Sequence, residues 1–149
     1  MAVTLFPPST YLLWNRTESA PKGLFWRSDG PLTVNRWAVV SGKAPSAIWI
    51  SERGYLAPDW PIIKRVRGVV GDQVCRENQL VSINGKAVAT AMKTDSADRN
   101  LPDWQGCFTV SEGQVFLLNN HPRSLDGRYF GATNRDDVTG SARLLISWD

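Results

Sequence analysis

The segment Leu80-Val81-Ser82-Ile83-Asn84-Gly85-Lys86-Ala87-Val88-Ala89-Thr90 gives the strongest local indication of the fold. Its Asn-Gly dipeptide stands between two apolar runs, and Asn-Gly favours the type I′ turn that joins neighbouring antiparallel strands. The sequence therefore predicts a β-hairpin with strands at 80–83 and 86–90.

Other short apolar runs, separated by glycine, proline and polar residues, predict more strands and little helix. These strands are expected at 36–40, 47–50, 62–70, 115–118 and 142–148. The polar stretch between Met92 and Gln105 is expected to be a loop or a cap. The predicted fold class is therefore mainly β, with an inserted hairpin.

Length and composition indicate one globular domain, residues 1–149. The chain is 42% hydrophobic and 21% charged, as soluble domains are. Its formal charge is +3, but the arginines are scattered and not gathered on one face, so nucleic-acid binding is not expected. The apolar start, 2–14, is too short and proline-broken for a membrane span, and it lacks the basic region of a signal peptide.

Two cysteines, Cys75 and Cys107, and a single histidine, His121, make a zinc site improbable, so no metal is expected. In an oxidising compartment the cysteines would form a disulfide that closes a loop of about 30 residues. In a reducing compartment they would be two buried thiols. The composition alone leaves both alternatives open.

Lys64 lies in the apolar run Pro61-Ile62-Ile63-Lys64-Arg65-Val66, which predicts a strand. Because side chains alternate between the two faces of a strand, Lys64 shares its face with Ile62 and Val66. A lysine on an apolar face loses hydration, which favours its neutral amine, and a neutral amine can take a proton from a serine hydroxyl. The alternative is a lysine whose ammonium reaches solvent from an edge strand.

A candidate nucleophile lies in Asn15-Arg16-Thr17-Glu18-Ser19-Ala20-Pro21-Lys22-Gly23-Leu24-Phe25. The hydroxyls of Thr17 and Ser19 stand two residues apart, and Pro21 and Gly23 favour a turn after them. This arrangement suits a serine nucleophile with its own oxyanion donor. A surface turn without chemistry is the alternative.

A third segment, Ser124-Leu125-Asp126-Gly127-Arg128-Tyr129-Phe130-Gly131, carries polar residues at every second position. In an extended chain, alternation places Ser124, Asp126 and Arg128 on one side. An Asp–Arg pair can hold a loop, and the serine beside it can orient an amine. The alternatives are a polar turn between strands, or a triad in which His121 and Asp126 serve a serine.

Taken in order, the three segments resemble the signal peptidase I (leader peptidase) family, and in particular its TraF-type peptidases of conjugative plasmid transfer. The shared motifs are Asn-x-Thr-x-Ser-x-Pro-x-Gly-Leu-aromatic, then Ile-Lys-Arg-Val-x-Gly-x-x-Gly-Asp, then Ser-x-Asp-x-Arg-Tyr-Phe-Gly. The resemblance runs from about residue 12 to residue 148. Two positions depart from the family: Ala20 stands where methionine is common, and Gly127 where serine is common.

The resemblance implies a signal-peptidase-like antiparallel β fold and a serine endopeptidase that needs no cofactor. It implies that Ser19 is the nucleophile and Lys64 the general base. It further implies an oxyanion hole made by the Thr17 hydroxyl and the Ser19 backbone N–H. The supporting residues that it implies are Ser124, which positions the lysine amine, and the ion pair of Asp126 with Arg128.

The resemblance also implies a location and partners. The location is the periplasmic face of a bacterial inner membrane, with residues 1–14 the stub after a missing membrane anchor and about 77–112 an inserted cap. This compartment favours a Cys75–Cys107 disulfide. The implied substrate is a pilin precursor or another exported protein, cut after small residues. Secretion-complex components are further expected partners. The acyl-enzyme is expected to be resolved either by water or by an amine of the substrate itself, which would yield a cyclic pilin.

Three other functions are compatible with the sequence. The chain could be a general signal peptidase that removes leader peptides, or a LexA-like protein that cleaves itself. It could also be a non-catalytic β module that binds peptides.

Overall fold

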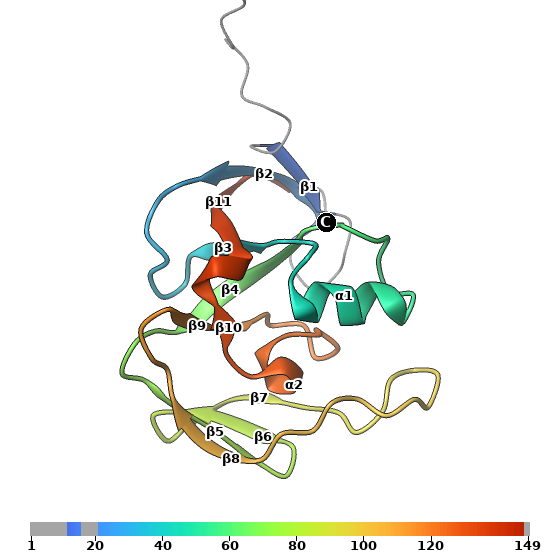
Figure 1. Ribbon diagram of the computed structural model, residues 1–149, viewed down its shortest axis with the longest axis vertical. Helices are drawn as coiled ribbons and strands as arrows, with labels where there is room; N and C mark the ends of the chain where they lie inside the picture. The colour runs from blue at the N-terminus through green and yellow to red at the C-terminus, as the bar shows by residue number, and fades with distance from the viewer. Residues whose placement is uncertain (1–11, 16–20, 148–149) are drawn as a thin grey trace, which may run out of the picture.

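The computed structural model of the protein describes residues 12–15 and 21–147, which form two antiparallel sheets (Figure 1). The larger sheet has the order β1 (Leu12–Asn15), β2 (Gly23–Ser28), β11 (Val138–Ser147), β3 (Trp37–Val40), β4 (Ile62–Gly68), β9 (Gln114–Leu118) and β10 (Thr133–Asn134). The smaller sheet, called the cap sheet below, has the order β7 (Lys86–Thr90), β6 (Leu80–Ile83), β5 (Gln73–Glu77) and β8 (Gly106–Thr109). The mainly β fold is therefore confirmed.

Helical structure is short among the described residues. Helix α1 (Pro45–Glu52) packs on the larger sheet, and α2 (Gly127–Phe130) lies between the two sheets (Figure 1). A 3-10 turn, Arg135–Asp137, leads into β11. No helix in the described part of the chain is long and apolar enough to cross a membrane.

The predicted hairpin is confirmed in position and turn type. Strands β6 and β7 pair from Leu80 opposite Thr90 to Ile83 opposite Lys86. At the turn, Asn84 has φ 51° and Gly85 has φ 83°, and a type I′ turn requires a positive φ at both of these positions.

The strand predicted at 47–50 is wrong, because these residues belong to helix α1. Pro45 stands at the first helical position, where its fixed φ suits a helix and its missing N–H is not needed. Ala47 and Ile50 are three residues apart and both point into the core, whereas Ile48 is exposed. A short apolar run with β-branched residues does not separate a buried helix from a strand, and packing decided the outcome.

Several other boundaries also differ from the prediction. The strand expected at 62–70 ends at Gly68, because Val69 enters a turn in which the Asp72 carboxylate accepts from its backbone N–H at 2.9 Å. The short strands β1, β2, β5, β8 and β10 are additional to those predicted. The stretch from Met92 to Gln105 contains no named strand or helix, as expected for a loop.

Strand β4 separates two hydrophobic clusters. Ile62 and Val66 pack with α1 residues on one face, whereas Ile63 packs with Phe25 and Val39 on the other. Lys64 is 5% exposed and lies on the face of Ile62 and Val66. The alternation predicted from the sequence therefore holds, and it places the lysine amine inside the protein.

The cap sheet is joined to the larger sheet by a shared core and is closed by a disulfide. Phe116 of β9 packs with Val74 and Val81 of the cap sheet. Cys75 and Cys107 face each other across β5 and β8 and form a disulfide between residues 32 positions apart.

Loss of this disulfide is expected to lower the free energy of unfolding by about 3 kcal/mol, because the bond restricts the unfolded chain. Urea unfolding of the double variant Cys75→Ser/Cys107→Ser, compared with the wild type, measures the change. Reductant should shift the wild-type midpoint toward that of the variant and leave the variant unchanged. Equal midpoints for oxidised wild type and variant would contradict the expectation.

Candidate active site

Lys64 is a buried amine that is hydrogen-bonded to a serine hydroxyl. Its Nζ donates to the Ser124 Oγ at 3.0 Å. The pKa of Lys64 is lowered from its ordinary 10.5 to about 8. Burial is the largest cause of this shift; the nearby Asp126 charge acts to raise the pKa, and the Arg128 charge acts to lower it. A substantial fraction of the amine is therefore neutral near pH 8, which is the form that accepts a proton.

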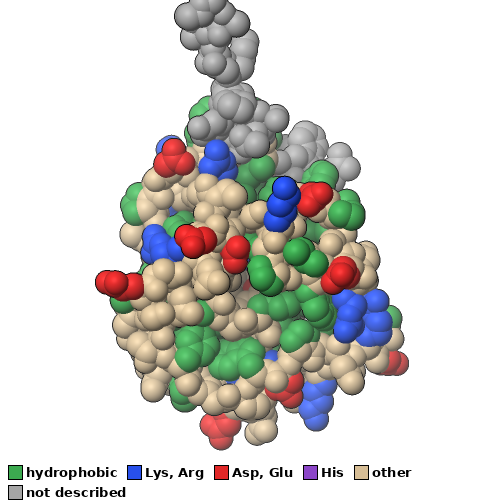
Figure 2. Space-filling model, viewed as in Figure 1, with side chains coloured by type: hydrophobic (Ala, Val, Ile, Leu, Met, Phe, Trp, Pro, Cys, Tyr) green, Lys and Arg blue, Asp and Glu red, His purple; other side chains and the backbone are tan. Residues whose placement is uncertain are grey.

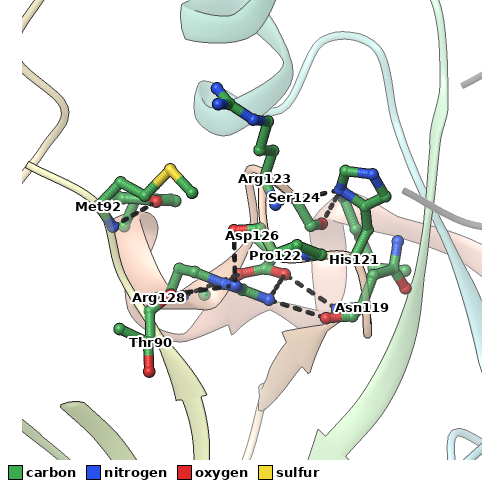
Figure 3. Close-up of polar contacts among 12 residues, drawn as sticks. Thr90, Met92, Asn119, His121, Pro122, Arg123, Ser124, Asp126 and Arg128 are labelled. Carbon is green, nitrogen blue, oxygen red and sulfur yellow. Dashed lines mark hydrogen bonds and ion pairs between the residues drawn. The ribbon is translucent and has the colours of Figure 1, made fainter. Parts of the chain in front are cut away.

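Asp126 and Arg128 form a buried ion pair (Figure 3), and both charges act on the pKa of Lys64. Arg128 Nε and Nη2 donate to the two carboxylate oxygens at 2.8 and 3.1 Å, and the side chains are only 2% and 0% exposed. The pair is bidentate, which fixes the planes of both groups. Asp126 also caps α2, because its carboxylate accepts from the Arg128 backbone N–H at 3.1 Å.

Ser124, Asp126 and Arg128 come together in a different way from the strand alternation predicted from the sequence. Ser124, Asp126 and Arg128 do not alternate along a strand, because Asp126 ends a loop and Arg128 lies in α2. The helix cap brings the carboxylate and the guanidinium together, and the preceding loop directs Ser124 toward Lys64.

Asn119 is a site residue that the sequence argument missed. Its side chain replaces a rung of the β4–β9 ladder: Nδ2 donates to the Ile63 carbonyl at 3.1 Å, and Oδ1 accepts from the Arg65 N–H at 3.1 Å. It therefore holds the backbone on both sides of Lys64. Its own N–H donates to Asp126 Oδ2 at 2.9 Å (Figure 3). The available signal was a polar residue placed directly after the apolar run of β9.

The departure at Gly127 has a steric reason. A Cβ at this position would lie 2.7 Å from the Leu117 carbonyl oxygen and 2.6 Å from the Phe116 ring. Because α2 packs so closely on β9, glycine is required here, and the serine common in the family would displace the helix.

His121 lies in the loop before Ser124. Its Nδ1 accepts from the Arg123 backbone N–H at 3.1 Å. The Asp126 carboxylate is engaged by Arg128 and by the Asn119 N–H. This carboxylate thus serves the ion pair, which is the role implied by the resemblance.

Ser19 and Thr17 lie outside the described residues. The chain on either side of them is described: Asn15 Nδ2 donates to the Pro21 carbonyl at 2.9 Å. Strands β1 and β2, which flank 16–20, pack through Leu13 and Phe25 on Ile63, the residue before Lys64.

Two surface hollows lined by described residues do not include Lys64 in their lining. One of about 470 Å³ is lined by Trp104, Phe108 and Phe130, and one of about 320 Å³ by Trp49 and Phe130 among others. Figure 2 shows apolar side chains on this face between α1 and the cap sheet. Within residues 12–15 and 21–147, no three His, Cys, Asp or Glu side chains converge as a metal site requires.

Comparison with known proteins identifies the family. The family described as "Signal peptidase, peptidase S26" matches residues 1–148. The chain is 33% identical over 147 residues to a plasmid transfer protein TraF of Escherichia coli, which covers 90% of this chain and 82% of the relative. It is 34% identical over 147 residues to a conjugal transfer protein TraF of Agrobacterium fabrum (strain C58), which covers 91% and 82% respectively.

A signal peptidase I from Enterococcus faecalis V583 is a similar solved structure, with 25% sequence identity and a TM-score of 0.41 over 80% of this chain and 100% of that one. The family match spans nearly the whole sequence, and the TraF relatives align along most of their own length. This chain therefore belongs to the signal peptidase family, peptidase S26.

Proposed function

We propose that this chain is a serine endopeptidase in which Ser19 is the nucleophile and Lys64 the general base. The observation that carries the proposal is the buried Lys64 amine, 5% exposed, with its pKa lowered to about 8 and its Nζ 3.0 Å from Ser124 Oγ. A lysine without a catalytic role is rarely buried in this way, because desolvation of its charge destabilises the fold. Family membership supports the same class of activity.

The proposed reaction begins with proton transfer. The neutral Lys64 amine takes the hydroxyl proton of Ser19 as its Oγ attacks the peptide carbonyl. The Thr17 hydroxyl and the Ser19 backbone N–H stabilise the oxyanion. The intermediate then collapses: the carbon–nitrogen bond breaks, and the Lys64 ammonium gives its proton to the leaving amine. Water, or an amine of the substrate itself, resolves the acyl-enzyme.

The supporting residues keep Lys64 ready for this step. Ser124 accepts from the amine and orients it. The opposite charges of Asp126 and Arg128 largely cancel, so the pair adds little net charge next to the Lys64 amine. Asn119 fixes the strand on both sides of the lysine.

The proposed substrate is a pilin precursor of a conjugative transfer system, cut after small residues at the periplasmic face of the inner membrane. The names of the relatives, plasmid transfer and conjugal transfer proteins, support a role in transfer. The proposed role of the region of about 77–112 is that of a cap.

Replacement of either dyad residue is expected to abolish cleavage. Purified Ser19→Ala and Lys64→Ala should each process a pilin precursor at least about 10³-fold more slowly than the wild type, because each removes a reacting group. Lys86→Ala changes an exposed lysine of the cap hairpin and is the matched control, with activity unchanged. Processing by either dyad variant at the wild-type rate would refute the proposed mechanism.

Activity is expected to rise with pH through about 8, because only the neutral Lys64 amine accepts the serine proton. Well below that pH, kcat/KM should increase about tenfold per pH unit and should level off above it. Cleavage of a fluorogenic peptide from pH 5.5 to 10 provides the measurement. A plateau already reached at pH 6 would exclude a lysine base.

Lys64→Met is expected to stabilise the protein while inactivating it. At pH 7 Lys64 is protonated in both the folded and the unfolded state, so the cost of its burial is fully present. The difference between 10.5 and about 8 corresponds to about 3 kcal/mol, and the unpartnered Ser124 hydroxyl offsets about 1 kcal/mol of this.

The free energy of unfolding at pH 7 should therefore increase by about 2 kcal/mol in Lys64→Met. The gain should diminish between pH 8 and 10.5, as the wild-type amine becomes neutral in the folded state. Urea unfolding at several pH values measures both effects. Destabilisation at pH 7 would show that the charged amine is well solvated in the fold.

A further inference from the structure

Helix α2 is hydrogen-bonded to the cap region, which is the cap sheet together with the loop 91–105, by contacts that the proposed chemistry does not use. Trp104 Nε1 donates to the Gly127 carbonyl at 3.1 Å, and Arg76 Nη1 donates to the Arg128 carbonyl at 2.8 Å. In the other direction, Arg128 Nη1 donates to the Thr90 carbonyl at 3.2 Å (Figure 3). Both carbonyls at the start of α2 are therefore held by cap side chains.

Tyr129 of α2 adds a further bond to the same region. Its hydroxyl accepts from the Met92 backbone N–H at 2.8 Å, and its ring packs with Ala91 and Leu101. The helix is only four residues long and cannot hold its own position, since it has few internal hydrogen bonds. The cap region, together with the close packing of Gly127 on β9, therefore holds α2 in place.

Arg76 is the most constrained of these cap residues. It lies on β5 next to the disulfide, and it is 2% exposed. In addition to its bond to Arg128, its Nε donates to the Asn78 carbonyl at 2.9 Å and its Nη1 to the Pro102 carbonyl at 3.3 Å. Its Nη2 lies 3.4 Å from the Asp103 carboxylate. A guanidinium with partners on several sides is fixed in position.

The position of α2 matters because it carries one of the charges that act on Lys64. Those charges are Asp126, which raises the pKa of Lys64, and Arg128, which lowers it; burial has the largest effect. Other described residues around the amine are uncharged, including Val40 of β3, Ser46 of α1 and Leu117 of β9. Movement of α2 would therefore change both the hydration of the amine and its local charge.

We propose that Arg76 is a positioning residue for Lys64: it fixes α2 from the cap sheet, and α2 in turn fixes the ion pair and covers the lysine amine. The inference rests on the Ser19–Lys64 mechanism proposed above. It makes the cap sheet part of the catalytic machinery and not only a cover for substrate.

The test is the pH dependence of kcat/KM for Arg76→Met, which removes every donor and keeps the apolar stem. Without the bond to Arg128, α2 loosens, water reaches Lys64, and its charged form becomes more stable. The midpoint of the activity profile should move up by about one pH unit, with about tenfold lower activity at pH 7 and recovery toward wild type near pH 10. A purely structural loss would lower activity equally at every pH.

Three further variants sharpen the test. Asp103→Asn removes the ionic partner of Arg76 but leaves the bond to Arg128, so its midpoint should match the wild type. Arg76→Lys keeps the positive charge but has one donor nitrogen in place of three. The midpoint of its pH profile should fall between those of wild type and Arg76→Met. If Arg76→Met does not fold by circular dichroism, Trp104→Phe replaces it, because it removes the indole N–H that bonds to Gly127 and keeps an aromatic ring against Phe108. Its midpoint should move in the same direction by a smaller amount.

The outcomes separate this inference from the mechanism on which it rests. If wild type shows a midpoint near 8 and Lys64→Ala is inactive, but folded Arg76→Met or Trp104→Phe keeps the wild-type midpoint, the role of Arg76 is wrong and the mechanism stands. If Lys64→Ala cleaves substrate, the mechanism itself is wrong.

Discussion

An ammonium group loses most of its hydration when it is placed on the inner face of a sheet. The groups around Lys64 compensate for only part of that lost hydration, so its charged form remains destabilised. Ser124 supplies one acceptor, and the only buried carboxylate near the amine, among the described residues, is already neutralised by Arg128. A free carboxylate there would hold the lysine charged and useless as a base. The paired carboxylate leaves the pKa of Lys64 near 8, where the neutral form is accessible.

The backbone on both sides of Lys64 is held by hydrogen bonds to a side chain, at a place where a neighbouring strand would normally supply backbone hydrogen bonds. Asn119 bonds to the residues before and after Lys64, so β4 cannot shift along β9 without breaking both contacts. Because its N–H also binds Asp126, the same residue sets the distance between the strand that carries the amine and the loop that carries the carboxylate. One asparagine thus links β4, which precedes it in sequence by more than 50 residues, to Asp126, which follows it by seven.

The sequence supported the parts of this picture that depend on local periodicity. Period-two alternation placed Lys64 on the inner face, and Asn84-Gly85 predicted the hairpin, because both depend on a few neighbouring residues. The helix at Pro45–Glu52 escaped prediction because a short apolar run is compatible with either structure until tertiary contacts decide. Asn119 and Arg76 also escaped it, since their roles arise only when strands distant in sequence meet. The Asp126–Arg128 pair was expected from a resemblance, but its geometry comes from a helix cap that alternation does not describe.

The hydrogen bonds between α2 and the cap region limit where insertions and deletions can be tolerated in this chain. A region inserted between two strands looks like a separable module, yet Arg76 and Trp104 attach this one to the residues beside the amine. Insertions and deletions would therefore be absorbed at the exposed tip of the hairpin near Asn84 or in the polar loop around Asp98, both of which face solvent. The base of the cap sheet would have to keep its length. A shortened chain would need a substitute for these two donors before Lys64 could keep the same surroundings.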